Sequence, residues 1–532
     1  MSKSRLIFCA VTSALAGFLF GFDTVVISGA EKQIQDIWTL NGTMHGWTLS
    51  AALWGTVIGS FFGGFPTSRF GRKKTLIAIG VLYFVSAIGS GIAGDVYTFI
   101  VARLIGGIGV GVSTIAAPLF ISEIAPAKDR GKLAGMFQFN IVFGILIAFF
   151  SNYLIHNIVD IDVAWRWMLG VEAIPAIIYT VMCFFLPESP RWLITHANKR
   201  KEGAAIFHQI NPDISDTELE ALVVDIEDTA CGTEKTSKFW SSRLKLPIML
   251  AFIIAFFNQM SGINVILYFA PRLLDLAGVS NALAASISLG VTNLIFTFVG
   301  IWLIDKLGRR TLLYIGSFGY IISLGVCALV FLSFTEFKVV SSSIDVISSA
   351  GKVIQIENKE GYRTLEDEKS VIYGFTVAKQ ALVAASELKT YKGNRVVIPA
   401  KATTAEVKVI AEKTKQESSK LLGVTSMIVL LCIIGFIAAH AVGQGAVIWV
   451  FISEIFPNDH RASGQALGSF THWIFAALLT LFFPIAIKAF DAGYMFAFFC
   501  LMMVLQLVWI KLMVPETKGL SLEEIEKDLG TY

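Results

Sequence analysis

Twelve windows of about 20 predominantly apolar residues divide this chain, and no other feature restricts its fold as strongly. A helix of about 20 apolar residues is long enough to cross the hydrocarbon core of a bilayer. The sequence therefore predicts an all-α integral membrane protein with twelve transmembrane helices. The windows cover residues 7–30, 46–66, 75–94, 97–121, 132–156, 166–187, 246–275, 282–304, 311–334, 423–452, 462–489 and 491–514.

The composition argues against a soluble protein. Of the 532 residues, 55% are hydrophobic and only 16% are charged, whereas an ordinary soluble domain is about 25% charged. A net charge of +3 on this length indicates no nucleic-acid partner. The sequence shows no metal-ligand cluster, nucleophile elbow or phosphate-binding loop, so it predicts neither an enzyme nor a bound cofactor or metal.

Basic residues predict the orientation of the chain in the membrane. The loops on the opposite face carry few of them, for example Lys32 alone between the first two windows. Because Lys and Arg accumulate in cytoplasmic loops, we expect both termini in the cytoplasm. The loops after the second, fourth and eighth windows hold Arg69, Arg72, Lys73, Lys74, Lys128, Arg130, Lys132, Lys306, Arg309 and Arg310.

Short strings of the first half of the chain return in the second half, in the same order. The spacing between the second-half strings is longer because a polar segment, 335–420, is inserted there. Two six-helix halves of this kind are the pattern of transporters whose site alternates between the two membrane faces. The matching strings are GRKK at 71–74 with GRRT at 308–311, SEIAP at 122–126 with SEIFP at 453–457, and PESP at 187–190 with PET at 515–517.

The repeat defines the expected domain organisation. We expect one six-helix half over residues 1–187 and a second over 246–334 together with 421–514. A polar, helix-favouring linker over 188–245 and a tail over 515–532 are predicted in the cytoplasm. Segment 335–420, with 14 Lys and Arg and 11 Asp and Glu, has the composition of a soluble segment and is predicted on the outer face.

Two opposite charges lie inside apolar windows, Asp23 in the first and Arg103 in the fourth. A charge at the bilayer centre costs from about 2.5 to above 10 kcal/mol, so each requires a reason. If the two residues pair, each offsets part of the desolvation penalty of the other. Such a carboxylate can also exchange a proton as its exposure changes. The alternative is a permanent ion pair that only fixes helix packing.

Uncharged polar side chains form a second set inside the windows. Three amides fall within seven residues of the seventh window, which favours a ligand site over isolated interhelical hydrogen bonds. Amides both donate and accept hydrogen bonds, as sugar hydroxyls do, and a flat Trp face suits a pyranose ring. The set comprises Gln138, Asn258, Gln259, Asn264, Asn293 and His472, with the aromatic Trp449 and Trp473.

Six strings together resemble the sugar porter family of the major facilitator superfamily, and in particular bacterial proton-coupled monosaccharide symporters of the xylose and glucose type. The resemblance covers all twelve windows and omits 335–420. The strings are GFDTVVISG at 21–29, PESPRWL at 187–193, QMSGINVILY at 259–268, DKLGRR at 305–310, SEIFP at 453–457 and PETKG at 515–519.

The resemblance implies roles for individual residues. It implies a proton-coupling pair of Asp23 and Arg103, and a charge network that latches the two halves at the cytoplasmic side. Asn258 and His472 stand where the family commonly has other amides, and we include both in the candidate substrate site. The implied sugar contacts are Gln138, Gln259, Asn264, Asn293 and Trp449, and the implied latch residues are Glu123, Arg130, Glu454 and Arg461.

We therefore expect a secondary transporter that imports a monosaccharide by alternating access, with protons as the coupling ion and no other cofactor. A facilitative uniporter, with Asp23 only structural, is the main alternative, and a transporter-like sugar sensor is another. A glycosylation sequon at 41–43 without one in 335–420 favours a bacterial inner membrane. We expect a monomer whose partners are the sugar and the lipid bilayer.

Overall fold

The computed structural model describes most of the predicted membrane body. The described residues are 3–125, 130–210, 214–232, 239–277, 279, 281–333, 364–367, 370–373, 396–399, 424–457, 460–490, 492–520 and 522–529. The side chain of Arg130, and the inserted segment 335–420 apart from three short strands, lie outside this description.

The twelve predicted spans correspond to helices of the structure. Eleven helices of the described residues are long and apolar enough to cross a membrane. The twelfth span is the pair α2 (Gly42–Phe62) and α3 (Gly64–Phe70), bent by 50°. The prediction of an all-α membrane fold is confirmed for the described body.

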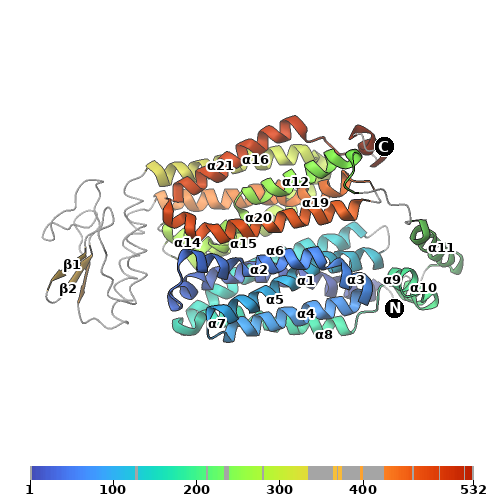
Figure 1. The fold of residues 1–532 in the computed structure, drawn as a ribbon, viewed down its shortest axis with the longest axis horizontal. Coiled ribbons are helices and arrows are strands. Elements are labelled where there is room, and N and C mark those ends of the chain that lie inside the picture. Colours follow the sequence, from blue (N-terminus) through green and yellow to red (C-terminus); the bar gives the residue numbers. More distant parts are fainter. Residues whose placement is uncertain are drawn as a thin grey trace.

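The first six spans lie together, from blue to cyan in Figure 1. Short helices of the segment between the halves follow them. In chain order the elements are α1 (Lys3–Ile37), α2 and α3, α4 (Arg72–Ile92), α5 (Val96–Ile124), α6 (Arg130–Ile158), and α7 (Ile161–Gly170) with α8 (Ala173–Phe184), followed by α9 (Pro190–Thr195), α10 (Arg200–Ile210) and α11 (Asp216–Gly232).

The remaining spans lie beside them, from green to red in Figure 1. The seventh span is broken into three helices, and the tenth into two. The elements are η1 (Ser242–Leu244), α12 (Lys245–Met260), α13 (Ile263–Tyr268), α14 (Ala270–Leu276), α15 (Ala282–Leu307), α16 (Arg309–Ser333), a helix over 424–442, α19 (Gln444–Glu454), α20 (Arg461–Ala489), α21 (Ala492–Met513) and α22 (Leu522–Asp528).

The bundle has two distinct ends. Both chain termini and α9 to α11 lie at one end, which we name the terminal end (Figure 1). Strands β1 (Thr364–Asp367), β2 (Ser370–Tyr373) and β3 (Val396–Pro399) form an antiparallel sheet in the order β1-β2-β3. Figure 1 shows β1 and β2 beyond the opposite end, which we name the sheet end.

Helix α1 is longer than its apolar window. The prediction ended this span at residue 30 and assigned Lys32 to a loop, whereas the helix continues to Ile37. The additional turns contain Glu31 and Gln35, which are 1% and 9% exposed. The window ended too early because hydropathy counts a carboxylate as solvent-exposed, whereas Glu31 is buried against partners from other helices.

The apolar core divides in a way that distinguishes the two ends. One cluster, which includes Leu6, Leu76 and Leu186, contains residues of the first half alone among those described. The other cluster unites both halves, and its first-half members include Leu40 and Trp165 next to the sheet-end loops. Apolar burial therefore joins the halves at the sheet end and leaves the first half with its own core toward the terminal end.

Gly262 breaks the seventh span between α12 and α13. Its φ of +86° is left-handed, and a Cβ there would stand 2.7 Å from the Phe499 ring. We expect Gly262→Ala to lower the free energy of unfolding by at least about 1–2 kcal/mol, the cost of a left-handed L-residue. Chemical denaturation in detergent measures this. Gly94→Ala, where no atom lies within 4 Å, is the matched control, and equal losses in both variants would contradict the prediction.

Candidate functional site

Asp23 and Arg103 meet in the interior of the first half, as the sequence predicted. The Asp23 side chain on α1 and the Arg103 side chain on α5 are each 2% exposed. Arg103 Nη1 donates to Asp23 Oδ1 at 2.5 Å, and Nη2 donates to the Asp23 backbone carbonyl at 3.1 Å. The guanidinium therefore binds both the charge and the backbone of α1, which holds the two helices in register.

Glu172 is a functional candidate that the sequence analysis missed. It lies at the break between α7 and α8, is 1% exposed, and is close enough to Asp23 and Arg103 for their charges to act on it. Its Oε1 has no hydrogen-bond partner among the described residues. The signal was present, because Glu172 is an acidic residue within an apolar window. Two carboxylates and one guanidinium thus share one buried place.

The amides of the seventh span form a hydrogen-bonded chain. Asn264 Nδ2 on α13 donates to Gln259 Oε1 on α12 at 2.8 Å. Gln259 Nε2 in turn donates to Asn258 Oδ1 at 3.1 Å and lies 3.0 Å from His472 Nε2 of α20. The break after α12 therefore brings these amides to His472, more than 200 residues later in the chain.

Aromatic rings surround this amide chain. His472 packs against Trp449 and Trp473, with ring centroids 5.4 and 4.6 Å apart. Trp473 also contacts Phe20 of α1, so the two halves meet here. The structure thus brings Asn258, Gln259, Asn264, Trp449 and His472 together.

The two remaining predicted sugar contacts lie on two helices, one from each half, that pack against each other. Gln138 lies on α6 and is partly exposed, and Asn293 lies on α15 and is 8% exposed. Helices α6 and α15 contact each other. Tyr268 of α13 is buried and lies in the neighbourhood of Arg103, and α13 packs against α1, which carries Asp23.

A buried charge cluster forms at the terminal end of the first half. Arg72 at the start of α4 binds Glu123 at the end of α5 through two hydrogen bonds of 2.7 and 2.9 Å. Ser189 Oγ donates to the same carboxylate at 2.5 Å. Glu188 accepts the backbone N–H groups of Arg72 and Lys73 at 2.8 and 3.1 Å, which caps the N-terminus of α4.

The second half repeats the cluster contact by contact. Arg309 at the start of α16 binds Glu454 through bonds of 2.6 and 3.1 Å, and Thr517 donates to Glu454 at 2.7 Å. Glu516 accepts the backbone N–H groups of Arg309 and Arg310 at 2.9 and 3.0 Å. The three repeated strings of the sequence thus converge on one cluster in each half.

The two glutamates of the expected latch have partners that the sequence analysis did not assign to them. Glu123 and Glu454 each pair with an arginine of their own half, Arg72 and Arg309, which the sequence analysis did not include. Nε and Nη2 of Arg461 have no hydrogen-bond partner among the described residues, and the Arg130 side chain lies outside the description. The described contacts of Glu123 and Glu454 lie within their own halves, and a latch between the halves through these four residues stays a prediction.

The fold and the site define a multi-span membrane transporter with two repeated halves. Residues 9–353 and 402–529 match the family model described as "Sugar (and other) transporter". The chain belongs to this family, which confirms the resemblance inferred from its motifs.

Individual relatives agree with this assignment. The chain is 30% identical to an arabinose-proton symporter of Bacillus subtilis, over 98% of this chain and 94% of that protein. It resembles the inward-open xylose transporter XylE from E. coli with a TM-score of 0.72 and 27% identity, covering 98% of this chain and 99% of that one. It also resembles XylE bound to 6-bromo-6-deoxy-D-glucose, with a TM-score of 0.67, 27% identity and coverage of 99% and 100%.

The two charge clusters differ in burial, which leads to a prediction. The Arg72 and Glu123 side chains are 7% and 10% exposed, against 12% and 19% for Arg309 and Glu454. Removing one partner of a buried pair costs about 3–5 kcal/mol. We expect Glu123→Gln to lower the free energy of unfolding by about this amount, and Glu454→Gln by less.

Denaturation in detergent measures both losses, with Glu218→Gln on the exposed surface of α11 as the control. A larger loss in Glu454→Gln than in Glu123→Gln would contradict the burial argument.

Proposed function

We propose that this protein is a proton-coupled symporter that imports a monosaccharide by alternating access. One observation carries the proposal: α1, which carries the buried pair of Asp23 with Arg103, packs against α13, which carries part of a chain of amides suited to a sugar. The buried carboxylates can hold a proton, and the amides can hydrogen-bond the hydroxyl groups of a sugar. The names of relatives, which include arabinose and xylose symporters, support the same substrate class.

The charge balance of the buried cluster supports coupling to protons. Two carboxylates face one guanidinium, so the cluster is balanced when it holds one proton and carries an excess negative charge when it holds none. An excess charge is costly in a low-dielectric interior. Release of the proton is therefore favoured only where the cluster gains access to water, which ties proton movement to the orientation of the site.

The hydrogen-bonding groups support a sugar as the substrate. Gln259, Asn264 and Asn258 offer both donors and acceptors, and the rings of Trp449 and Trp473 offer flat apolar faces. In the absence of sugar, the amides satisfy one another. When a sugar binds, the amides replace these internal hydrogen bonds with hydrogen bonds to the sugar hydroxyls. Few buried polar groups are then left without a partner.

The orientation follows from the basic loops and is part of the proposal. We place the terminal end in the cytoplasm, because Arg72, Lys73, Lys306 and Arg309 lie there. The bacterial relatives favour the inner membrane, with the sheet end facing the periplasm. In this orientation the protein is closed at the periplasmic end, in accord with the likeness to inward-open XylE.

Replacement of Asp23 tests the coupling. In Asp23→Asn, Arg103 and Glu172 form a balanced pair that no longer needs a proton. We expect this variant to keep sugar exchange down a gradient and to lose accumulation driven by an imposed pH gradient. Uptake of radiolabelled D-xylose, L-arabinose and D-glucose into proteoliposomes measures both, and mutual competition among the three identifies the preferred sugar.

The control for Asp23→Asn is Asp216→Asn, an exposed carboxylate of α11. It should accumulate sugar like the unmodified protein. If Asp23→Asn also accumulates sugar against its gradient, Asp23 is not the coupling group. The unmodified protein gives the second outcome to check. If its sugar uptake neither acidifies the liposome lumen nor changes with an imposed pH gradient, the protein is a uniporter and the Asp23–Arg103 pair is structural.

Replacement of Gln259 tests the sugar site. Gln259→Leu removes the central amide of the hydrogen-bonded chain, and a lost hydrogen bond to a buried polar group costs roughly 1–3 kcal/mol. We expect the preferred sugar to bind about ten- to a hundredfold more weakly, as measured by calorimetry on the purified protein. Gln506→Leu, a buried amide on α21, is the control, and equal affinities of both variants would remove Gln259 from the site.

A further inference from the structure

Arg272 joins the two halves at the sheet end. It lies on α14, the last piece of the broken seventh span, and its two hydrogen-bonding partners among the described residues lie on α1 of the first half. Nη1 is 3.2 Å from Glu31 Oε2, and Nη2 donates to Gln35 Oε1 at 2.7 Å. The two Arg–Glu pairs described above at the terminal end, in contrast, each lie within one half.

Glu31 is held in place for this contact. Its side chain is 1% exposed, and its Oε2 also lies 2.9 Å from Nε2 of His45 at the start of α2. His45 is fully buried. The carboxylate is therefore fixed between an imidazole of its own half and a guanidinium of the other half.

Close backbone packing accompanies this contact. Gly46, next to His45, lies against α20, where an added Cβ would stand 2.0 Å from the Leu481 carbonyl oxygen. Together with the shared apolar core near Leu40 and Trp165, this closes the sheet end. Arg272 adds the directional, charged part of the closure.

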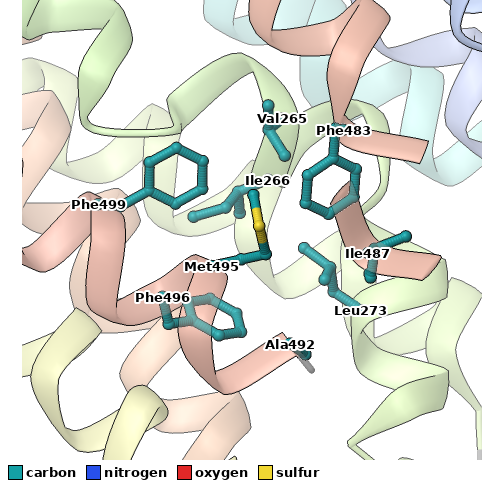
Figure 2. A pocket seen from close by; sticks show the side chains of 9 residues that line it. All are labelled: Val265, Ile266, Leu273, Phe483, Ile487, Ala492, Met495, Phe496 and Phe499. Carbon is teal, nitrogen blue, oxygen red and sulfur yellow. The ribbon is translucent and has the colours of Figure 1, made fainter. Parts of the chain in front are cut away.

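The other side of α14 borders an apolar pocket, shown in Figure 2. Leu273, adjacent to Arg272, and Val265 and Ile266 of α13 line it from one side. Phe483, Ile487, Ala492, Met495, Phe496 and Phe499 of α20 and α21 line it from the other. Helix α14 thus has polar bonds to α1 through Arg272, whereas the side chains that line the pocket beside it are apolar.

We propose that Arg272 is the latch of the sheet end. Its bonds to Glu31 and Gln35 hold α14 on α1 while the site opens toward the terminal end, and both bonds break when the sheet end opens. Because α13 and α14 are consecutive, the latch is also linked to Asn264 in the amide chain. The inference rests on alternating access as proposed above, but neither sugar nor a proton gradient is needed to test it.

The test measures distances across both ends of the bundle in nanodiscs. One nitroxide pair replaces Tyr97 and Tyr494, which are 67% and 58% exposed on the two halves at the sheet end. A second pair replaces the exposed Lys74 and Lys511 at the terminal end. Double electron–electron resonance spectroscopy measures the distance distribution of each nitroxide pair. We expect Arg272→Gln to lengthen the sheet-end distance and shorten the terminal-end distance.

Arg166→Gln is the matched control at the same end. Arg166 donates to the carbonyls of Gly91 and Ala93, both in its own half, at 3.0 and 2.8 Å, so both distributions should match those of the unmodified protein. Unchanged distributions in Arg272→Gln, or equal changes in Arg166→Gln, overturn the latch.

A milder variant keeps the test valid if Arg272→Gln does not fold. Gln35→Leu removes one bond of Arg272 and leaves its ion pair with Glu31. We expect a smaller shift in the same direction, and no shift overturns the proposal. Failure of sugar uptake or proton coupling alone would leave these distances unaffected, so the two proposals fail separately.

Discussion

A charge buried in a bilayer persists only beside a partner, and the pair of Asp23 and Arg103 meets this constraint inside the first half. Because Arg103 also binds the Asp23 backbone carbonyl, the pair fixes how α1 lies against α5. Glu172 places a second carboxylate near them, and the packing of α13 on α1 brings the buried Tyr268 of the other half close to the same charges. The chain of amides on α12 and α13 is thus built beside a group whose charge depends on its access to water.

The two ends of the molecule are held together by different forces. At the terminal end, carboxylates cap helix starts and pair with arginines inside each half, which ties the helices of each half to one another there. At the sheet end, apolar packing, a close glycine contact and one charged latch connect the halves. Strong contacts within the halves and fewer polar contacts between them let rigid bodies rock about the site in the middle.

The sequence predicted the membrane spans and the buried pair of Asp23 and Arg103, because hydropathy and a charged residue inside an apolar window can both be read from a short stretch of sequence. It did not predict that Arg72 and Arg309 are the partners of Glu123 and Glu454, since helix packing brings together residues far apart in the chain. The strings that contain these residues were recognised as a repeat, but a repeat does not show which of its members touch. Glu31 was missed for another reason: a carboxylate past the end of an apolar window looks solvent-exposed until Arg272 and His45 are seen beside it.

The length of α1 has a consequence for the depths of its charged residues. Its 35 residues rise about 52 Å at about 1.5 Å per residue, which exceeds a hydrocarbon core of about 30 Å. Glu31 lies about 12 Å further along the helix than Asp23, so the two acidic residues occupy different depths. A residue about 12 Å from the middle of a core of about 30 Å lies near the edge of that core, so the pair of Glu31 and Arg272 is held closer to the membrane surface than the pair of Asp23 and Arg103. The long first helix therefore carries one buried ion pair deep in the membrane and a second near its surface, so the charge cost of separating the second pair is the smaller of the two.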